Sequence, residues 1–447
     1  MKLFKTATLL FCILAIQLSA QRKVTLKEAV DYALQNQADA KKAKLEIENS
    51  EYLIQEARAG ALPSLSGTGN LTYNPILQKS ALPGEFFGQP EGTTILVPFG
   101  QKWSSTVGVQ LNQNLFDQTV FTGLKAAKTT REFYQINAQL TEEQVIERVA
   151  TAYYNVFVQK EQLETIDSSY LNISKSRDII KSLFENGLAR EIDLDRVSVQ
   201  LMNLSTTRQQ LVNAVQVQEN ALKFYMGMPI EQEIELAEED FTVEEHLMPE
   251  NMETENRTEM KVLKKQEELL ELQKEARKAA YYPSLSLVAN YNYQGLGNEF
   301  PIFGKEENGV YWSDFSMIGL NLKIPIFNGF ATKARVNQAD IELRTLQEDI
   351  KNTELSLDLE YQNAKSQIEN NLIAIENQQE NVSLAQKVVD NTQNNYRQGL
   401  ATLTDLLEAQ NALVDAKNNY SNAVLQYKLA EIQLLKSTGE LNTLTEQ

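Results

Sequence analysis

The residue types best suited to catalysis or metal binding are scarce in this chain. It has one histidine, His246, and one cysteine, Cys12, among 447 residues. His246 lies in the acidic stretch 238–255, where we expect a solvated loop histidine. The sequence contains no glycine-rich phosphate loop, no metal-ligand spacing and no nucleophile paired with a base. Carboxylates remain, above all Asp405 and Glu408, which lie three residues apart and so share a helix face.

Two long segments of the chain, which hold Asp405 and Glu408 among other residues, are predicted to be helical. Residues 124–226 and 330–438 contain no proline and one glycine each, Gly187 and Gly399. Glycine or proline inside a helix costs about 1 to 3 kcal/mol. Gly187 lies 64 residues after the preceding glycine and 40 before the next, and the steps around Gly399 are 70 and 40. The spacing predicts helices of roughly 95 Å and 60 Å, which span a distance instead of filling a globular core.

The N-terminus is typical of a secretory signal peptide. Two lysines precede an apolar run, and Ser19 and Ala20 supply small residues for cleavage, so we expect residues 1–20 to be removed. Removal would take away Cys12 and exclude disulfide and thiolate metal sites. The formal charge is −18, and about −20 without the two leader lysines, which argues against nucleic acid as a partner. We expect no later transmembrane helix.

The two halves of the chain repeat each other. Residues 62–66 (LPSLS) recur as 282–286 (YPSLS), and Trp103 recurs as Trp312. The segment NGLA at 186–189 recurs as QGLA at 398–401. The long period indicates a duplicated half-molecule. We expect a first repeat at 21–230, a linker at 231–255 and a second repeat at 256–447.

Each repeat is predicted to begin with a helix. The first runs from about Leu26 to Ala61, opened by a capping box of Thr25 and Glu28, and its counterpart covers about 256–281. In the later long helix, residues 368–396 carry a heptad-like seam that is rich in glutamine. An ordinary helical bundle is one interpretation. The helix lengths and the polar seam favour a thin-walled, water-lined assembly.

Four segments alternate apolar and polar residues, as strands do: about 63–75, 104–116, 283–294 and 314–327. Each is long enough for a tilted strand to cross a bilayer. Aromatic residues lie at or near the predicted strand ends, as in an interfacial girdle: Tyr73, Trp103, Phe116, Tyr291, Tyr293, Trp312 and Phe327. One such segment alone also fits a soluble sandwich, but four in an exported chain favour a membrane barrel.

Four strands cannot close a barrel by themselves. Open sheet edges cannot face lipid, because their backbone groups would be unpaired. About eight strands are the usual minimum for a barrel. Several copies must therefore share one barrel, and three copies would supply 12 strands.

Together these features resemble the TolC family of outer-membrane efflux and export channels. The resemblance rests on the duplication, the Pro-Ser before the first strand of each half, and the segments 184–194 and 396–410. It implies a membrane α/β fold: a homotrimer with a 12-stranded β-barrel in the outer membrane and a long α-helical coiled-coil tunnel in the periplasm. The linker 231–255 and the tail after Gly439 would girdle the tunnel.

The resemblance also assigns roles to the two helix-turn-helix tips. The positions that match adaptor docking are Gly187, Leu188, Gly399 and Leu400. A tip without any partner is the alternative.

The positions that match the periplasmic entrance or gate are Asp193, Tyr396, Asp405 and Glu408. In a trimer, Asp405 and Glu408 would form two stacked acidic rings that attract cations; solvated helix-tip acids are the alternative. The family's partner arginine falls on Ala401, and Arg190 or Arg397 are candidates to replace it.

We therefore expect a passive outer-membrane channel of a tripartite efflux or type I export system. Its partners would be a periplasmic adaptor, an inner-membrane transporter and outer-membrane lipid, with no cofactor, no metal and no enzymatic activity. One alternative is an exported coiled-coil structural or adaptor protein without a pore. Another is a periplasmic enzyme that uses carboxylates alone.

Overall fold

The computed structural model describes residues 23–237, 253–301 and 306–445. The predicted signal peptide, with Cys12, lies outside the described residues, as do His246 and most of the predicted linker. The chain forms two compact units: Met1–Glu48, Phe133–Lys265 and Gln347–Gln447 in the first, Asn49–Glu132 and Gln266–Leu346 in the second.

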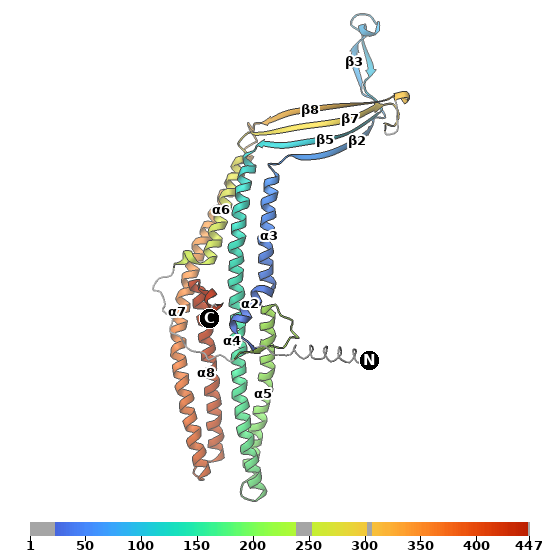
Figure 1. Cartoon of the computed structure of the whole chain (residues 1–447). Helices are drawn as coiled ribbons and strands as arrows, with labels where there is room; N and C mark the ends of the chain where they lie inside the picture. The colour runs from blue at the N-terminus through green and yellow to red at the C-terminus, as the bar shows by residue number, and fades with distance from the viewer. Residues whose placement is uncertain (1–22, 238–252, 302–305, 446–447) are drawn as a thin grey trace, which may run out of the picture. The chain divides into compact units, whose positions relative to one another are not determined.

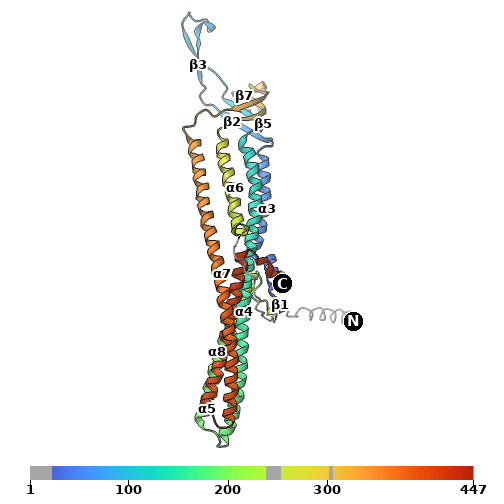
Figure 2. The same ribbon diagram turned by 90° about the vertical axis from the view of Figure 1, so that its left-hand side faces the viewer.

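Long helices dominate the fold (Figures 1 and 2). α4 has 68 residues and α7 has 67, while α5 and α8 have 36 each. The glycine- and proline-free stretches therefore form the helices that they predict. The helices are α2 (Leu26–Asn36), α3 (Ala38–Ala59), α4 (Gln118–Glu185), α5 (Glu191–Met226), α6 (Thr258–Ala279), α7 (Ala331–Arg397) and α8 (Leu403–Thr438).

The start of α4 differs from the prediction. The helix begins at Gln118 and runs through Gly123 instead of starting after it. Asp117 explains the earlier start, because its Oδ1 accepts a hydrogen bond from the Thr119 N–H at 2.8 Å. An aspartate at this position satisfies one of the free donors of a helix N-terminus.

The prediction of one helix from Leu26 to Ala61 is wrong. The chain breaks at Gln37, whose backbone is extended with φ −64° and ψ 140°. The Gln37 side chain explains the break, because its Oε1 accepts hydrogen bonds from the N–H groups of Asp39 and Ala40 and so caps α3. The capping box of Thr25 and Glu28 that was predicted to open α2 is present.

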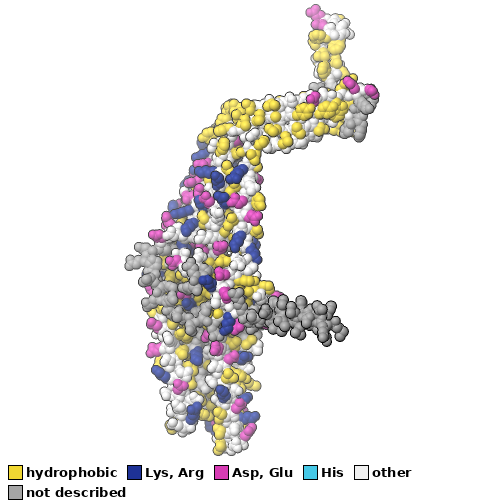
Figure 3. Space-filling model, viewed as in Figure 1, with side chains coloured by type: hydrophobic (Ala, Val, Ile, Leu, Met, Phe, Trp, Pro, Cys, Tyr) yellow, Lys and Arg dark blue, Asp and Glu magenta, His cyan; other side chains and the backbone are white. Residues whose placement is uncertain are grey.

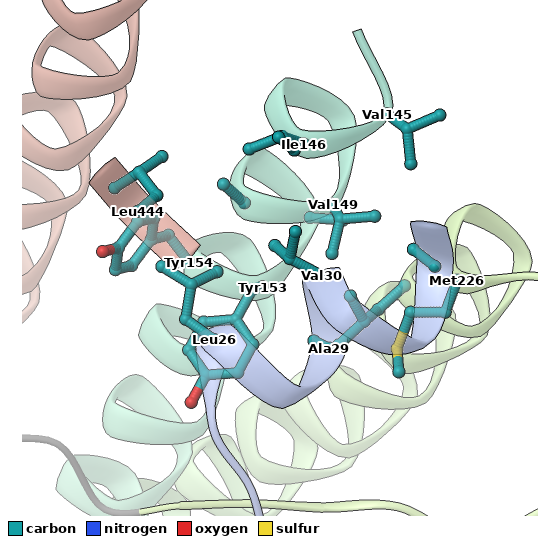
Figure 4. Close-up of a cluster of buried hydrophobic side chains, with 14 of the residues drawn as sticks. Leu26, Ala29, Val30, Val145, Ile146, Val149, Tyr153, Tyr154, Met226 and Leu444 are labelled. Atoms are coloured by element: carbon teal, nitrogen blue, oxygen red, sulfur yellow. The ribbon is translucent and has the colours of Figure 1, made fainter. Parts of the chain in front are cut away.

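α2 is held by the main hydrophobic cluster of the first unit (Figure 4). Ala29, Val30 and Ala33 are fully buried on one face of this short helix. Burying one large apolar side chain contributes about 1.5 to 3 kcal/mol. The side chains labelled in Figure 4 come from α2, α4, α5 and the C-terminal segment: Leu26, Ala29, Val30, Val145, Ile146, Val149, Tyr153, Tyr154, Met226 and Leu444.

Four strands form one antiparallel sheet in the order β2-β5-β7-β8. They are β2 (Ser64–Tyr73), β5 (Trp103–Phe116), β7 (Ser284–Gly297) and β8 (Val310–Lys323). The central pair joins β5 of the first half to β7 of the second. Within the described part of the chain, β2 and β8 each pair on one side only.

Two details of the predicted strands are wrong. The alternation predicts the last strand at 314–327, but the strand lies at 310–323. Pro325 accounts for its end, because proline has no N–H to donate and restricts the residue before it. Tyr291 lies in the middle of β7, where it pairs with Val109 and Ser316, and not near a strand end.

The two faces of the sheet differ in polarity. On one face, polar side chains bond one another: Gln110 donates to Asn112, Asn292 to Asn290, and Gln294 to the hydroxyl of Thr106. The other face is apolar and exposed, including Leu65, Val109, Tyr291, Ile318 and Leu320. Figure 3 shows hydrophobic side chains gathered over these strands, whereas charged side chains of both signs are scattered over the helices.

Aromatic rings pair at both ends of the sheet. Tyr73 lies 4.5 Å from Trp103 and Tyr293 lies 4.9 Å from Trp312, between ring centroids. At the opposite strand ends, Phe116 lies 6.1 Å from Phe121 and Phe327 lies 5.4 Å from Phe330. Such rings suit the interface between lipid and water.

The remaining elements are short. The segment 75–102 between β2 and β5 contains a hairpin of β3 (Lys79–Pro83) and β4 (Thr94–Pro98). β1 (Lys23–Val24) and β6 (Glu235–Leu236) form a parallel pair. In the described ranges, no helix has the length and apolar character needed to span a membrane. The short 3-10 helices are η2 (Gly84–Phe87), η3 (Thr254–Asn256), η5 (Glu306–Asn308) and η6 (Leu441–Thr445).

Candidate functional site at the two helical tips

Both tips reverse the chain with the same turn. The Gly187 N–H donates to the Phe184 carbonyl at 2.9 Å, and the Leu188 N–H donates to the Leu183 carbonyl at 2.8 Å. Between α7 and α8, Gly399 bonds the Tyr396 carbonyl at 3.0 Å and Leu400 bonds the Asn395 carbonyl at 2.8 Å. This is the Schellman pattern of helix ends. It needs a left-handed residue, and the glycines have φ of +74° and +75°.

The leucine after each glycine points into solvent. Leu188 and Leu400 are each 75% exposed. A Cβ added at Gly187 or Gly399 would meet no atom within 4 Å. The four residues predicted for docking thus form two equivalent surfaces, each with a bare backbone turn and one free apolar side chain.

Asp193 forms an ion pair within its own tip. Arg190 Nε lies 2.9 Å from Asp193 Oδ2, and Arg190 Nη2 lies 3.1 Å from Oδ1. The hydrogen bonds and the negative charge of Asp193 raise the pKa of the Arg190 guanidinium. Of the two arginines that the sequence left open, Arg190 is therefore the one bound to Asp193.

Tyr396 joins the two tips through packing. Its ring contacts a cluster of Ile180 from α4, Val197 from α5 and Leu403 from α8. Burial raises the pKa of the Tyr396 hydroxyl, and the negative charge of Asp193 raises it further. Asp193 and Tyr396 therefore lie close enough to influence each other, although they are far apart in sequence.

Asp405 is engaged at the start of α8. Its Oδ2 accepts hydrogen bonds from the Thr402 N–H and hydroxyl at 2.8 Å each, while its own N–H donates to Thr402 Oγ1 at 3.2 Å. The bonds from Thr402 hold the pKa of the Asp405 carboxyl below its usual value. This capping box was not predicted, although the sequence Thr402-x-x-Asp405 is close to the pattern that signals one.

Glu408 lies one turn further along α8 and is exposed. It lines an open groove of ≈ 400 Å³ between α5 and α8, with Arg196 and Asp195 on the opposite side. Both predicted entrance acids are exposed. Asp405 is bonded to Thr402, whereas Glu408 lines the groove between α5 and α8.

Two hydrogen bonds between α5 and α8 were missed by the sequence analysis. Arg196 Nη1 donates to Thr404 Oγ1 at 2.6 Å, and Gln200 Nε2 donates to Asn411 Oδ1 at 2.5 Å. The donors are four residues apart and the acceptors are seven apart, so each pair lies on one helix stripe. This spacing is the feature of the sequence that could have predicted the two hydrogen bonds. Across the described ranges, no three His, Cys, Asp or Glu side chains are grouped to hold a metal ion.

Three comparisons with known proteins agree with one another. The profile of the family described as "Outer membrane efflux protein" matches residues 29–228 and 251–440. Outer membrane protein TolC of Vibrio cholerae serotype O1 is 25% identical over 354 residues, 76% of this chain and 77% of that protein. Proteases secretion protein PrtF of Dickeya chrysanthemi is 20% identical, over 98% of this chain and 93% of that protein. The CmeC outer membrane channel of Campylobacter jejuni has a TM-score of 0.73 at 18% identity, covering 93% of this chain and 85% of that one, and so shares its fold.

Proposed function

Because this chain belongs to the outer membrane efflux protein family, we propose that three copies of it form one passive duct through the outer membrane and the periplasm. The predicted resemblance to the TolC family is confirmed. The protein is an outer-membrane channel of the class that serves tripartite efflux or type I export, with a helical periplasmic extension.

The sheet is the observation that carries the trimer proposal. One face is apolar and exposed, as lipid requires, and the other carries bonded amides, as a water-filled lumen requires. The edges of β2 and β8 would be unpaired in lipid unless a neighbouring copy covers them. Pairing β2 of one copy with β8 of the next closes 12 strands from three copies.

The duplication of the chain also remains a proposal, with 231–255 as the linker between its halves. The near-equal lengths of α4 and α7, the equal lengths of α5 and α8, and the identical turns at the tips support it. The offset of 212 residues between Gly187 and Gly399 fits the repeat found in the sequence.

The tips are the proposed contact with a periplasmic adaptor, which in turn connects the duct to an inner-membrane transporter. Leu188 and Leu400 offer exposed apolar anchors, and the glycines before them let a partner backbone approach. Lone exposed leucines are common on protein surfaces. Two of them at equivalent turns, each beside an unobstructed glycine, favour a docking role.

The entrance is the proposed role of the polar residues behind the tips. In a trimer, three copies of Glu408 would place a ring of negative charge near the end of the tunnel, which attracts cations. Asp193, with its charge near Tyr396, and Tyr396, packed against residues of both tips, would set the diameter of that entrance. Asp405 would act mainly by holding the first turn of α8 in place.

Single-channel recording in planar bilayers tests this function. We expect the mature protein to conduct, with preference for cations, and Glu408→Gln to reduce that preference. Glu56→Gln, on the exposed surface of α3, removes the same charge away from the tips and is the matched control. Absence of conductance from an inserted trimer would contradict the duct. An unchanged ion preference in Glu408→Gln would contradict the role of Glu408 at the entrance, but it would not contradict the channel function.

A further inference from the structure

A cluster of basic residues interrupts the acidic character of the chain where helices meet the sheet. The whole chain has a formal charge of −18. Yet the last two turns of α6 carry Lys274, Arg277 and Lys278 against one acid, Glu275, and the first eight residues of α7 carry Lys333 and Arg335 and no acid. A local excess of positive charge on an acidic protein points to an anionic ligand.

Both arginines of this cluster line a groove between α6 and α7. The groove has a volume of ≈ 220 Å³ and is lined by Gln273 and Arg277 from α6 and by Arg335, Gln338, Ala339 and Glu342 from α7. Across the described part of the chain, neither guanidinium has a hydrogen bond or an ion pair. Two unpaired guanidiniums and two amides offer several N–H donors to one ligand.

A neighbouring ion pair leaves the two arginines of the groove unpaired. Lys274 bonds Asp340 at 2.5 Å. That bond lowers the pKa of the Asp340 carboxyl, and the charges of Arg344 and Lys278 lower it further. Asp340 is therefore neutralised by Lys274, which leaves Arg277 and Arg335 available. Glu342 is the one acid that lines the groove.

The groove lies directly beyond an exposed aromatic belt. Tyr281 and Tyr282 connect α6 to β7, and Phe327 and Phe330 lie between β8 and α7; all four are more than half exposed. Arg335 is four residues into α7, about 6 Å along the helix axis. A belt of aromatic residues marks the boundary of the hydrocarbon layer, and a groove just beyond such a belt would lie at the depth of lipid headgroups.

The order of charges along α7 matches one class of headgroup. Arg335 is nearest the sheet, Gln338 follows one turn later, and Glu342 lies another turn beyond. A phosphoethanolamine headgroup has its phosphate nearest the acyl chains and its ammonium further out. At the ends of β7 and β8 that connect to α6 and α7, Leu285 and Leu322 pair on the apolar face of the sheet, where acyl chains would lie.

We propose that the α6–α7 groove binds the headgroup of a phosphatidylethanolamine molecule in the periplasmic leaflet of the outer membrane. Arg277 and Arg335 hold the phosphate, Gln273 and Gln338 donate further hydrogen bonds to its oxygens, and Glu342 receives the ammonium. The bound lipid fixes the junction between helices and strands at a constant depth.

Native mass spectrometry of the mature protein in detergent tests this site. The probes are dioleoyl phosphatidylethanolamine and dioleoyl phosphatidylglycerol, each titrated separately. We expect Arg277→Gln/Arg335→Gln to weaken the binding of both lipids, on the order of tenfold. Glu342→Gln should weaken binding of the ethanolamine lipid and leave the glycerol lipid unchanged or tighter. Lys387→Gln/Lys417→Gln, with the same loss of charge on α7 and α8, is the control and should bind like wild type.

Three results would overturn the proposal. The first is equal binding by wild type and the double arginine variant, and the second is an equal loss in the lysine control. The third is binding of soluble phosphoethanolamine as tightly as of the whole lipid, which would indicate a free-anion site. Retention of the wild-type oligomeric state and melting temperature shows that each variant is folded. Conductance recorded on the same samples separates failure of this site from failure of the proposed duct.

Discussion

At the scale of single residues, Leu188 and Leu400 are the most direct test of adaptor docking. Replacing both with aspartate puts charge at the two exposed apolar anchors without touching the core. We expect adaptor binding in a pull-down to fall at least tenfold, because buried apolar anchors dominate the energy of such interfaces. The turns and the unfolding temperature should not change, since both side chains are already in solvent.

The matched control for this pair replaces both leucines with methionine. Methionine keeps an apolar side chain of similar volume, so binding should be near that of wild type. Equal binding by the aspartate variant and the wild type would exclude the tips as the docking site.

Asp405 leads to a prediction about acid. Its pKa is lowered in the folded protein by hydrogen bonds from Thr402, so its contribution to stability is present above the unfolded pKa of about 3.9 and is lost as pH falls through the folded pKa. We expect the first turn of α8 to lose protection from hydrogen exchange below about pH 4, and Asp405→Ala to show the same loss at neutral pH. Protection that is independent of both changes would contradict the capping role.

At the scale of helices and strands, Arg257 explains how the C-terminal end of α8 is fixed. Its side chain is 2% exposed, donates to the Ser437 carbonyl at 3.0 Å and pairs with Glu259 at 2.7 Å. We expect Arg257→Met to lower the free energy of unfolding by about 3 kcal/mol, because it leaves a carbonyl and a carboxylate without their partner. Denaturant unfolding measures this loss.

The control for Arg257 is Lys264→Met. Lys264 pairs with Glu255 at 2.9 Å, but both side chains are exposed. Exposed ion pairs contribute about 0 to 1 kcal/mol, so this variant should unfold almost like wild type. An equal loss of unfolding free energy in the two variants would mean that burial does not determine how much the Arg257–Glu259 pair stabilises the protein.

Much of the element structure could be predicted because it depends on local pattern. Proline-free runs with few glycines predict long helices, and alternation predicts strands wherever one face is apolar. The break at Gln37 was not predictable in this way, because glutamine is a good helix former and the break depends on a side-chain bond to Asp39 and Ala40. The end of β8 had a signal in Pro325, which the alternation through Ile326 obscured.

The candidate site was predicted less completely than the fold. The turn glycines and their leucines are visible as a repeated motif. The pairing of Arg190 with Asp193, the capping role of Asp405 and the bonds between α5 and α8 depend on which rotamers the packed helices allow. Residue spacing restricts those contacts to a few helix faces, but it does not select the partner.

At the scale of the whole molecule, the central claim is that three copies share one barrel. The test uses cysteine pairs on the two edge strands, Thr68→Cys on β2 with Met317→Cys or Gly319→Cys on β8. The native sequence has no cysteine after Cys12, so no native cysteine of the mature chain competes for disulfide formation. Within one chain β2 and β8 are three strand spacings apart, roughly 14 Å, beyond the reach of a disulfide.

Oxidation of the double variants in isolated outer membranes, followed by denaturing electrophoresis, is therefore the most direct measurement. We predict a covalent trimer in at least one of the two pairings, and at most dimers from each single-cysteine variant. Monomers alone from both pairings, in protein that is otherwise folded and inserted, would contradict the shared barrel.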